Sequence, residues 1–202
     1  MKHSRRIAGL VVACAVAAAV AGAAEPQKQE PKAKGTSQKG DPPEMAPPRP
    51  VPQHQELAKR VGTWDAVVES YMEPGAPPQA SRGSETNTMD SSGLWLLTEF
   101  KGQMMDQPFE GHGITGFDTA KNKYVGVWAD SYGTHMMTME GTGDASGRIT
   151  MLGESPGMDG KMERLKIVTE PKGDGAYTMT MTRRGPDGKD VPGVRITYTK
   201  RG

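Results

Sequence analysis

The sequence predicts an all-β protein: an antiparallel up-and-down barrel of about ten strands, preceded by a short N-terminal helix. After Gly62 the chain shows no second convincing helical period. Short runs rich in Val, Thr, Ile, Met and Tyr follow one another instead, with turn residues about every 12 positions. This spacing is typical of a meander of antiparallel strands.

The one predicted helix lies in the stretch HQELAKRVGTW, which begins at His54. Leu57, Ala58 and Val61 occur at positions i, i+1 and i+4, which places three apolar side chains on one side of a helix. Gly62 is expected to end it. We expect His54, at the helix start, to be exposed to solvent.

Ten runs carry the residue pattern of strands and account for most of the remaining chain. In chain order they are 63–72, 81–89, 94–102, 109–118, 123–131, 134–142, 147–154, 161–170, 176–184 and 194–200.

The connections between these runs alternate in character, which favours a barrel. Four are short hairpin turns: 90–93, 118–122, 144–147 and 172–175. Most of the others are longer: 73–80, 103–108, 130–134, 155–160 and 185–193. In an up-and-down barrel successive turns fall at opposite ends, so one end would be closed by tight turns and the other would carry the longer loops around a mouth. A two-layer sandwich with the same meander is the alternative.

The chain is predicted to divide into three segments. Residues 1–24 combine a basic start with a short apolar run that ends in alanines, which predicts a secretory signal peptide rather than a retained membrane anchor. Residues 25–52 hold half of the 16 prolines and no aromatic residue, and they predict a disordered linker rich in Pro and Lys. Residues 53–202 form the barrel domain.

Composition excludes several classes of function. The signal peptide implies a periplasmic or secreted protein, and its cleavage would remove Cys14, the only cysteine. The formal net charge of +1, without a basic stripe interleaved with aromatics, argues against nucleic acid as a partner. No apolar run after residue 24 is long enough to give a stable membrane span. We expect no cofactor.

A glycine motif, Gly111-x-Gly113-x-x-Gly116, has the spacing of a nucleotide-binding loop. Such a loop needs a helix directly after it, because the helix N-terminus holds the phosphate. Here the next residues predict a strand instead. Pairing across the turn places Gly113 opposite Trp128, so we interpret these glycines as positions that leave room for the indole.

Asp130 and His135 form the best polar pair in the chain. Pairing of the predicted strands places them opposite each other, where His135 could act as a general base oriented by the carboxylate. An ion pair at the barrel rim is the preferred interpretation, because no nucleophile accompanies them. His112 would face the opposite side of the sheet from His135, so the two cannot ligate one metal and we expect no metal site.

Methionine is abundant, and its alternation places much of it inside the barrel. Thioethers could ligate copper(I), but methionine also suits a pocket that accepts varied apolar shapes, and we favour the pocket. Two further methionines and a tyrosine fall in the predicted loops of the mouth. The candidate ligand-binding residues are Trp128, Met137, Met139, Met104, Met105 and Tyr132.

The stretch VGTW, after the helix and at the start of the first strand, resembles the Gly-x-Trp motif of lipocalins. In that family the tryptophan closes one end of the barrel and meets a basic side chain from the last strand. The resemblance therefore implies that Trp64 closes an end of this barrel, with Lys200 or Arg201 as its partner.

A more specific resemblance covers nearly all of residues 53–201. The stretches HQELAKRVGTW, PGAPPQASRGS, GHGITGFD, KYVGVWADSYGT and YTKRG are similar to the bacterial domain-of-unknown-function family 1579. The resemblance implies a bacterial β domain. It brings no activity and no catalytic residues.

The function expected from the sequence is the binding of a small apolar or amphipathic molecule inside the barrel. One alternative is a non-enzymatic envelope interaction or scaffold protein whose barrel is packed solid. A second is a hydrolase or isomerase that uses Asp130 and His135. The interior volume of the barrel separates the first two, because a binding barrel must leave a cavity.

Overall fold

The computed structural model describes residues 46–72, 75–157, 160–185 and 188–202. The predicted signal peptide, and the predicted linker as far as residue 45, lie outside these residues. In the described ranges, no helix has both the length and the apolar character that a membrane crossing requires.

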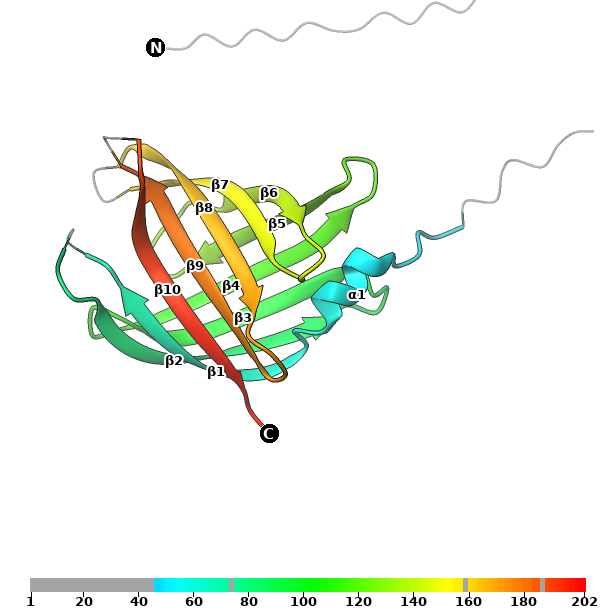
Figure 1. Ribbon diagram of the computed structural model, residues 1–202, viewed down its shortest axis with the longest axis horizontal. Helices are drawn as coiled ribbons and strands as arrows, with labels where there is room; N and C mark the ends of the chain where they lie inside the picture. The colour runs from blue at the N-terminus through cyan, green and yellow to red at the C-terminus, as the bar shows by residue number, and fades with distance from the viewer. Residues whose placement is uncertain (1–45, 73–74, 158–159, 186–187) are drawn as a thin grey trace, which may run out of the picture. The chain divides into compact units, whose positions relative to one another are not determined.

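One short helix precedes ten strands, as the residue pattern predicted (Figure 1). Their bounds are α1 Pro52–Ala58, β1 Gly62–Ser70, β2 Gln79–Met89, β3 Trp95–Met104, β4 Gln107–Asp118, β5 Lys123–Asp130, β6 Met137–Gly143, β7 Ile149–Pro156, β8 Met162–Pro171, β9 Ala176–Arg184 and β10 Asp190–Lys200.

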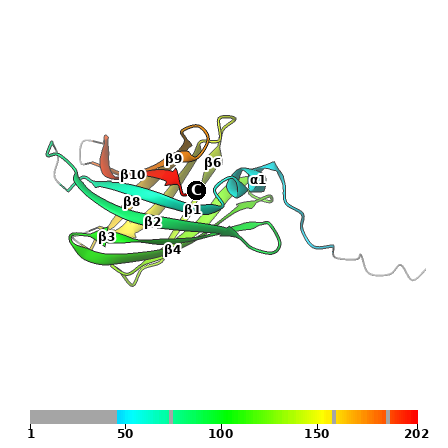
Figure 2. The ribbon, with the colours of Figure 1, turned by 90° about the horizontal axis from the view of Figure 1, so that it is seen from below.

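The strands form one closed antiparallel barrel, in which each strand pairs with the next along the chain. The first and last strands complete the ring, with pairs from Trp64↔Lys200 to Ser70↔Val194 (Figures 1 and 2). Closure gives every strand two hydrogen-bonded neighbours and leaves no free sheet edge. The up-and-down barrel is therefore confirmed and the two-layer sandwich is wrong.

Alternation along each strand decides which side chains enter the barrel. In β1, Trp64, Ala66 and Val68 are buried, while Asp65 and Val67 between them are exposed. The same period of two places the inner methionines of β6, β7 and β9 on the side that the sequence predicted. The interior is thus a direct consequence of the strand register.

The connection between β3 and β4 differs from the sequence-based expectation. The sequence predicted a loop at 103–108 on the mouth side, but β3 continues to Met104 and β4 begins at Gln107. Met105 and Asp106 alone form the turn, with φ of 51° and 59°. Positive φ at both central residues is the geometry of a tight type I′ hairpin, which matches the twist of the strands it joins.

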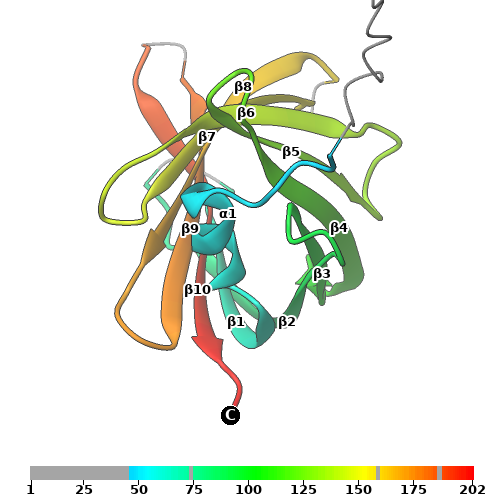
Figure 3. The ribbon, with the colours of Figure 1, turned by 90° about the vertical axis from the view of Figure 1, so that its right-hand side faces the viewer.

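Helix α1 lies across one end of the barrel (Figure 3). Leu57 is fully buried and packs with Leu96, Tyr124, Ile149 and Met151. These four residues come from β3, β5 and β7, so a single helical turn covers strands from across the ring. The helix closes this end with an apolar contact.

His54 corrects another expectation. It was predicted to be exposed at the helix start, but only 3% of the residue is accessible. Its Nδ1 accepts a hydrogen bond from the backbone N–H of Val51 at 3.0 Å, and its ring meets Phe117 edge-on with centroids 6.1 Å apart. The imidazole therefore caps the first helical turn and packs against the barrel rim, which the local sequence does not reveal.

Trp64 occupies the same end of the barrel and is buried. Its Nε1 donates to the carbonyl oxygen of Arg60 at 2.8 Å, and the Lys200 Nζ lies 5.5 Å from its ring centroid. Lys200 is thus the basic partner, whereas Arg201 bonds to Asp65 on the surface. The tryptophan ties the residues after α1 to the last strand, as the lipocalin resemblance implied.

Replacing Trp64 by alanine is expected to lower the free energy of unfolding by about 3–5 kcal/mol, because a large buried aromatic leaves a cavity. Chemical denaturation measures this loss. Trp95, on the outer wall, is 41% exposed and serves as the control, with an expected loss of about 1 kcal/mol for Trp95→Ala. Equal losses for the two variants would contradict the assigned role of Trp64.

Candidate functional site

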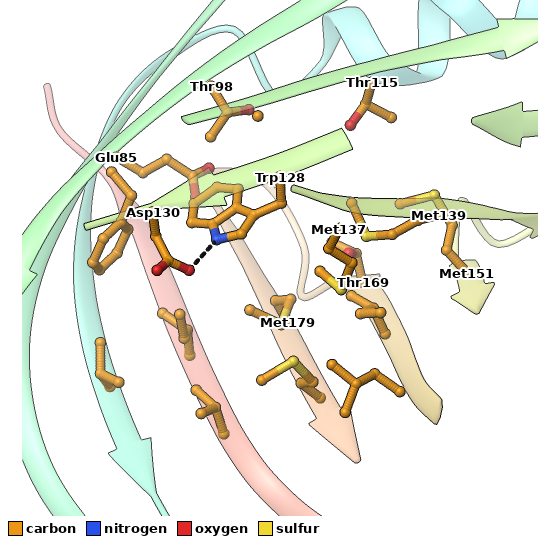
Figure 4. Close-up of a pocket in the computed structure, with 18 of the residues that line it drawn as sticks. Glu85, Thr98, Thr115, Trp128, Asp130, Met137, Met139, Met151, Thr169 and Met179 are labelled. Atoms are coloured by element: carbon orange, nitrogen blue, oxygen red, sulfur yellow. Dashed lines mark hydrogen bonds between the residues drawn. The ribbon is translucent and has the colours of Figure 1, made fainter. Parts of the chain in front are cut away.

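The interior of the barrel holds a cavity of about 330 Å³ that is partly open to solvent. Much of its wall is apolar and comes from β6 to β10. Four of its methionines are visible in Figure 4, on the side of the cavity away from Thr98. The methionines that line it are Met104, Met137, Met139, Met151, Met179 and Met181.

Trp128 lies on the opposite wall, where Figure 4 shows its indole between Thr98 and Asp130. Its Nε1 donates to Asp130 Oδ2 at 3.0 Å, which fixes the plane of the ring. A Cβ atom added to Gly111 would lie 2.2 Å from the indole Cζ2, and one added to Gly113 would lie 3.1 Å from Cε3. The register Gly113↔Trp128 is the predicted one. The two glycines therefore make room for Trp128.

The candidate ligand-binding residues divide between the cavity wall and the surface. Trp128, Met137, Met139 and Met104 line the cavity. Met105 sits in the β3–β4 turn, is 55% exposed and is not part of the wall. Tyr132 is also exposed and outside the wall, where its hydroxyl donates to the Met104 carbonyl oxygen at 2.7 Å.

Asp130 and His135 both border the cavity but do not form the predicted pair. The ladder between β5 and β6 ends at Trp128↔Met137, and the chain leaves the sheet between them. Asp130 accepts hydrogen bonds from Trp128 Nε1 and from the backbone N–H of Tyr132, whereas His135 Nε2 contacts the Glu154 carbonyl oxygen at 3.3 Å. Each side chain is held by other groups, so a histidine–carboxylate dyad is not assembled.

A buried polar cluster at one side of the cavity escaped the sequence-based predictions. Glu85 is 7% exposed and accepts hydrogen bonds from Asn87 Nδ2, at 2.6 Å, and from the Tyr177 hydroxyl. Thr98 Oγ1 donates to Asn87 Oδ1 at 2.6 Å. The Tyr198 ring stacks on Tyr177 with centroids 4.3 Å apart, and the charge of Glu85 acts on its hydroxyl. We call Glu85, Asn87, Thr98, Tyr177 and Tyr198 the polar cluster.

Strand β2 gives little sign of this cluster, because both of its faces are polar. The inward residues Glu85 and Asn87 alternate with Thr86 and Thr88, which face outward. Alternation therefore cannot say which side enters the barrel. The pairing of β1 with β2 was the one signal that could have shown that Glu85 faces inward, because it places Glu85 beside the buried Trp64.

Burial sets the ionisation of the tyrosines in the cluster. Desolvation raises the pKa of both phenols far above the usual value, and the charge of Glu85 adds to the shift. Both hydroxyls therefore stay protonated and can donate to the carboxylate. No three His, Cys, Asp or Glu side chains of the described residues converge as a metal site would require.

The fold and its cavity define a closed up-and-down β-barrel protein with a mostly apolar interior cavity. Residues 49–200 match the family described as Protein of unknown function (DUF1579), and the chain belongs to that family. The resemblance drawn from the sequence stretches is thereby confirmed. No curated protein matches the chain.

One of the similar solved structures supports the barrel fold. Rv2717c from M. tuberculosis is 13% identical, with a TM-score of 0.56, and the match covers 75% of this chain and 99% of that one. A redesigned beta barrel matches at 13% identity and a TM-score of 0.39, over 73% of this chain and 96% of its own. A de novo designed fluorescence-activating beta barrel matches at 16% identity and a TM-score of 0.39, over 72% and 96%. At this level of identity, the likeness to Rv2717c shows the fold alone.

Gly111→Ala is expected to destabilise the barrel by roughly 1–3 kcal/mol, because the new methyl group overlaps the Trp128 indole. Thermal unfolding measures the loss. Gly133→Ala is the matched control, since its added Cβ would meet only a backbone nitrogen at 3.8 Å. In a Trp128→Leu background the Gly111→Ala penalty should shrink, and an unchanged penalty there would show that the indole contact is not its cause.

Stability is expected to fall in alkaline solution because of Tyr177 and Tyr198. Their folded pKa values lie above the unfolded value of about 10, so the stability they contribute is complete below that pH and is lost as the pH rises beyond it. Part of the phenolate absorbance of the five tyrosines should therefore appear only with loss of the near-ultraviolet circular dichroism. Full ionisation of a protein that stays folded would contradict this.

Proposed function

We propose that this protein binds one small apolar or amphipathic molecule inside its barrel. The observation that carries the proposal is the interior cavity of about 330 Å³. A barrel that served only as a scaffold could fill its interior with side chains. The volume lies at the lower end of the range of about 300–1,000 Å³ that is usual for ligand pockets.

The chemistry of the wall also supports this proposal. Methionine side chains are unbranched and polarisable, so they adapt to apolar ligands of different shape. Met137, Met139, Met151 and Met179 face the cavity (Figure 4), and Glu85 provides a polar group at another part of the wall. A mostly apolar surface with a few placed polar groups is typical of a small-molecule site.

The scaffold alternative rests on a different surface. An open hollow of about 720 Å³ lies on the outer wall over β3 to β8, bordered by Trp95, Ile114 and Leu152. These three large apolar side chains are exposed, and clustered exposed apolar groups mark contact sites for other macromolecules. The outer hollow is larger and more open than the cavity, so it favours a broad partner rather than a small ligand.

The catalytic alternative has lost its geometric basis. Its two candidates, Asp130 and His135, bond to different groups, and neither reaches the other. We therefore propose a binding protein rather than a hydrolase or isomerase.

The neutral fluorescent dye Nile red is expected to bind the wild-type protein with one molecule per chain. Met104→Gln should weaken its binding roughly three- to tenfold, because a polar group replaces part of the apolar wall. Met105→Gln is the matched control, since the neighbouring side chain lies outside the cavity, and it should leave the affinity unchanged. Fluorescence titration measures both. A wild-type protein that takes up no dye would remove the binding proposal and favour the scaffold.

A further inference from the structure

Arg60 brings a positive charge to the cavity wall from the segment between α1 and β1. Its backbone N–H donates to the Leu57 carbonyl oxygen at 3.0 Å, and its own carbonyl accepts the Trp64 indole N–H at 2.8 Å. The backbone is therefore held on both sides. The guanidinium Cζ lies 5.8 Å from the centroid of the Tyr177 ring, beside the polar cluster.

The guanidinium lacks a hydrogen-bonding partner within the described part of the chain. Its contacts there are the Tyr177 ring and the longer-range charges of Glu85 and Glu56. The residue keeps partial exposure, yet burial dominates its electrostatics and lowers its pKa. A desolvated cation is costly unless it is paired and hydrogen-bonded. The guanidinium therefore offers free donors to an acceptor that enters the cavity.

Glu85 does not fill that need. Its carboxylate accepts hydrogen bonds from Asn87 and Tyr177, and among the described residues it makes no ion pair with Arg60. Both of these hydrogen bonds end on Oε1 and disperse the negative charge of Glu85. The cavity thus has, at the same end, an anion that accepts hydrogen bonds and a cation that donates none to the described residues.

We propose that Arg60 binds the terminal carboxylate of a medium-chain amphipathic ligand whose apolar chain lies along the methionine wall. This inference rests on the proposed binding function and adds the chemistry of the ligand's head group. A guanidinium offers two parallel N–H donors that match the two oxygens of a carboxylate. The limited volume of about 330 Å³ favours a medium rather than a long chain.

Other head groups fit the charges less well. An ammonium group would be repelled by Arg60, and Glu85 already accepts two hydrogen bonds, which weakens its attraction for a further cation. A hydroxyl group can accept one hydrogen bond from Arg60, but it cannot accept both parallel N–H donors of the guanidinium or neutralise the positive charge. The order of affinity expected for equal chains is therefore carboxylate, then alcohol, then amine.

Competition against Nile red tests this order with decanoate, decanol and decylamine, each below the concentration at which it aggregates. Decanoate should displace the dye at concentrations on the order of ten- to a hundredfold lower than decanol, as a charge-assisted bond implies. This comparison uses the wild-type protein, so it does not depend on the folding of any variant. Decanol that competes as well as decanoate would overturn the proposal.

Arg60 variants then assign the preference to this residue. Arg60→Gln should bind decanoate and decanol with similar affinities and should still bind Nile red. Arg60→Lys should keep only part of the preference for decanoate, because an ammonium group lacks the two parallel donors of the planar guanidinium. Arg82→Gln is the matched control, since Arg82 is exposed on the outside of β2. The melting temperature of each variant confirms folding.

The outcomes separate this inference from the proposed function. Dye binding without a preference for decanoate refutes the carboxylate site and leaves the binding cavity intact. A preference that persists in folded Arg60→Gln also refutes it. Absence of dye binding in the wild-type protein refutes the binding function itself, and the carboxylate site with it.

Discussion

The pairing of β1 with β10 is the contact on which the rest of the structure depends. The ladder from Trp64↔Lys200 to Ser70↔Val194 joins the two ends of the domain and turns a meander into a ring. It also fixes the direction of every side chain, because a slip of one residue would move a whole strand's inward set to the outside. The buried Trp64, beneath Lys200, stabilises this register at the end where α1 covers the barrel.

Glycine placement controls how the closed ring uses its interior. Aromatic rings can lie flat against the wall only where the facing residue has no side chain. Gly111 and Gly113 accommodate Trp128 in this way, and Phe100 lies over Gly83, where an added Cβ would approach to 2.6 Å. The glycines therefore let these rings pack close to the strand backbone, which leaves space in the interior.

The cavity is chemically asymmetric, and long-range topology produces the asymmetry. Methionines from β6, β7 and β9 supply an apolar wall, while residues of β2, β3, β9 and β10 form the polar cluster. Arg60 joins that cluster from outside the sheet, through the segment that α1 and Trp64 hold in place. Such a wall can orient a ligand that has one polar end, since the two ends of the ligand contact different side chains.

The sequence by itself determined the strands, the up-and-down order, the inward methionines and the role of the glycines around Trp128. All of these follow from local rules, because a strand has a period of two and a hairpin fixes the register of its neighbours. Tertiary structure alone decided the rest: the buried His54, the separate partners of Asp130 and His135, and the cluster around Glu85. These depend on where α1 docks, where the β5–β6 ladder ends and which polar face of β2 turns inward. Such choices are made by contacts between residues far apart in the chain, and periodicity does not encode them.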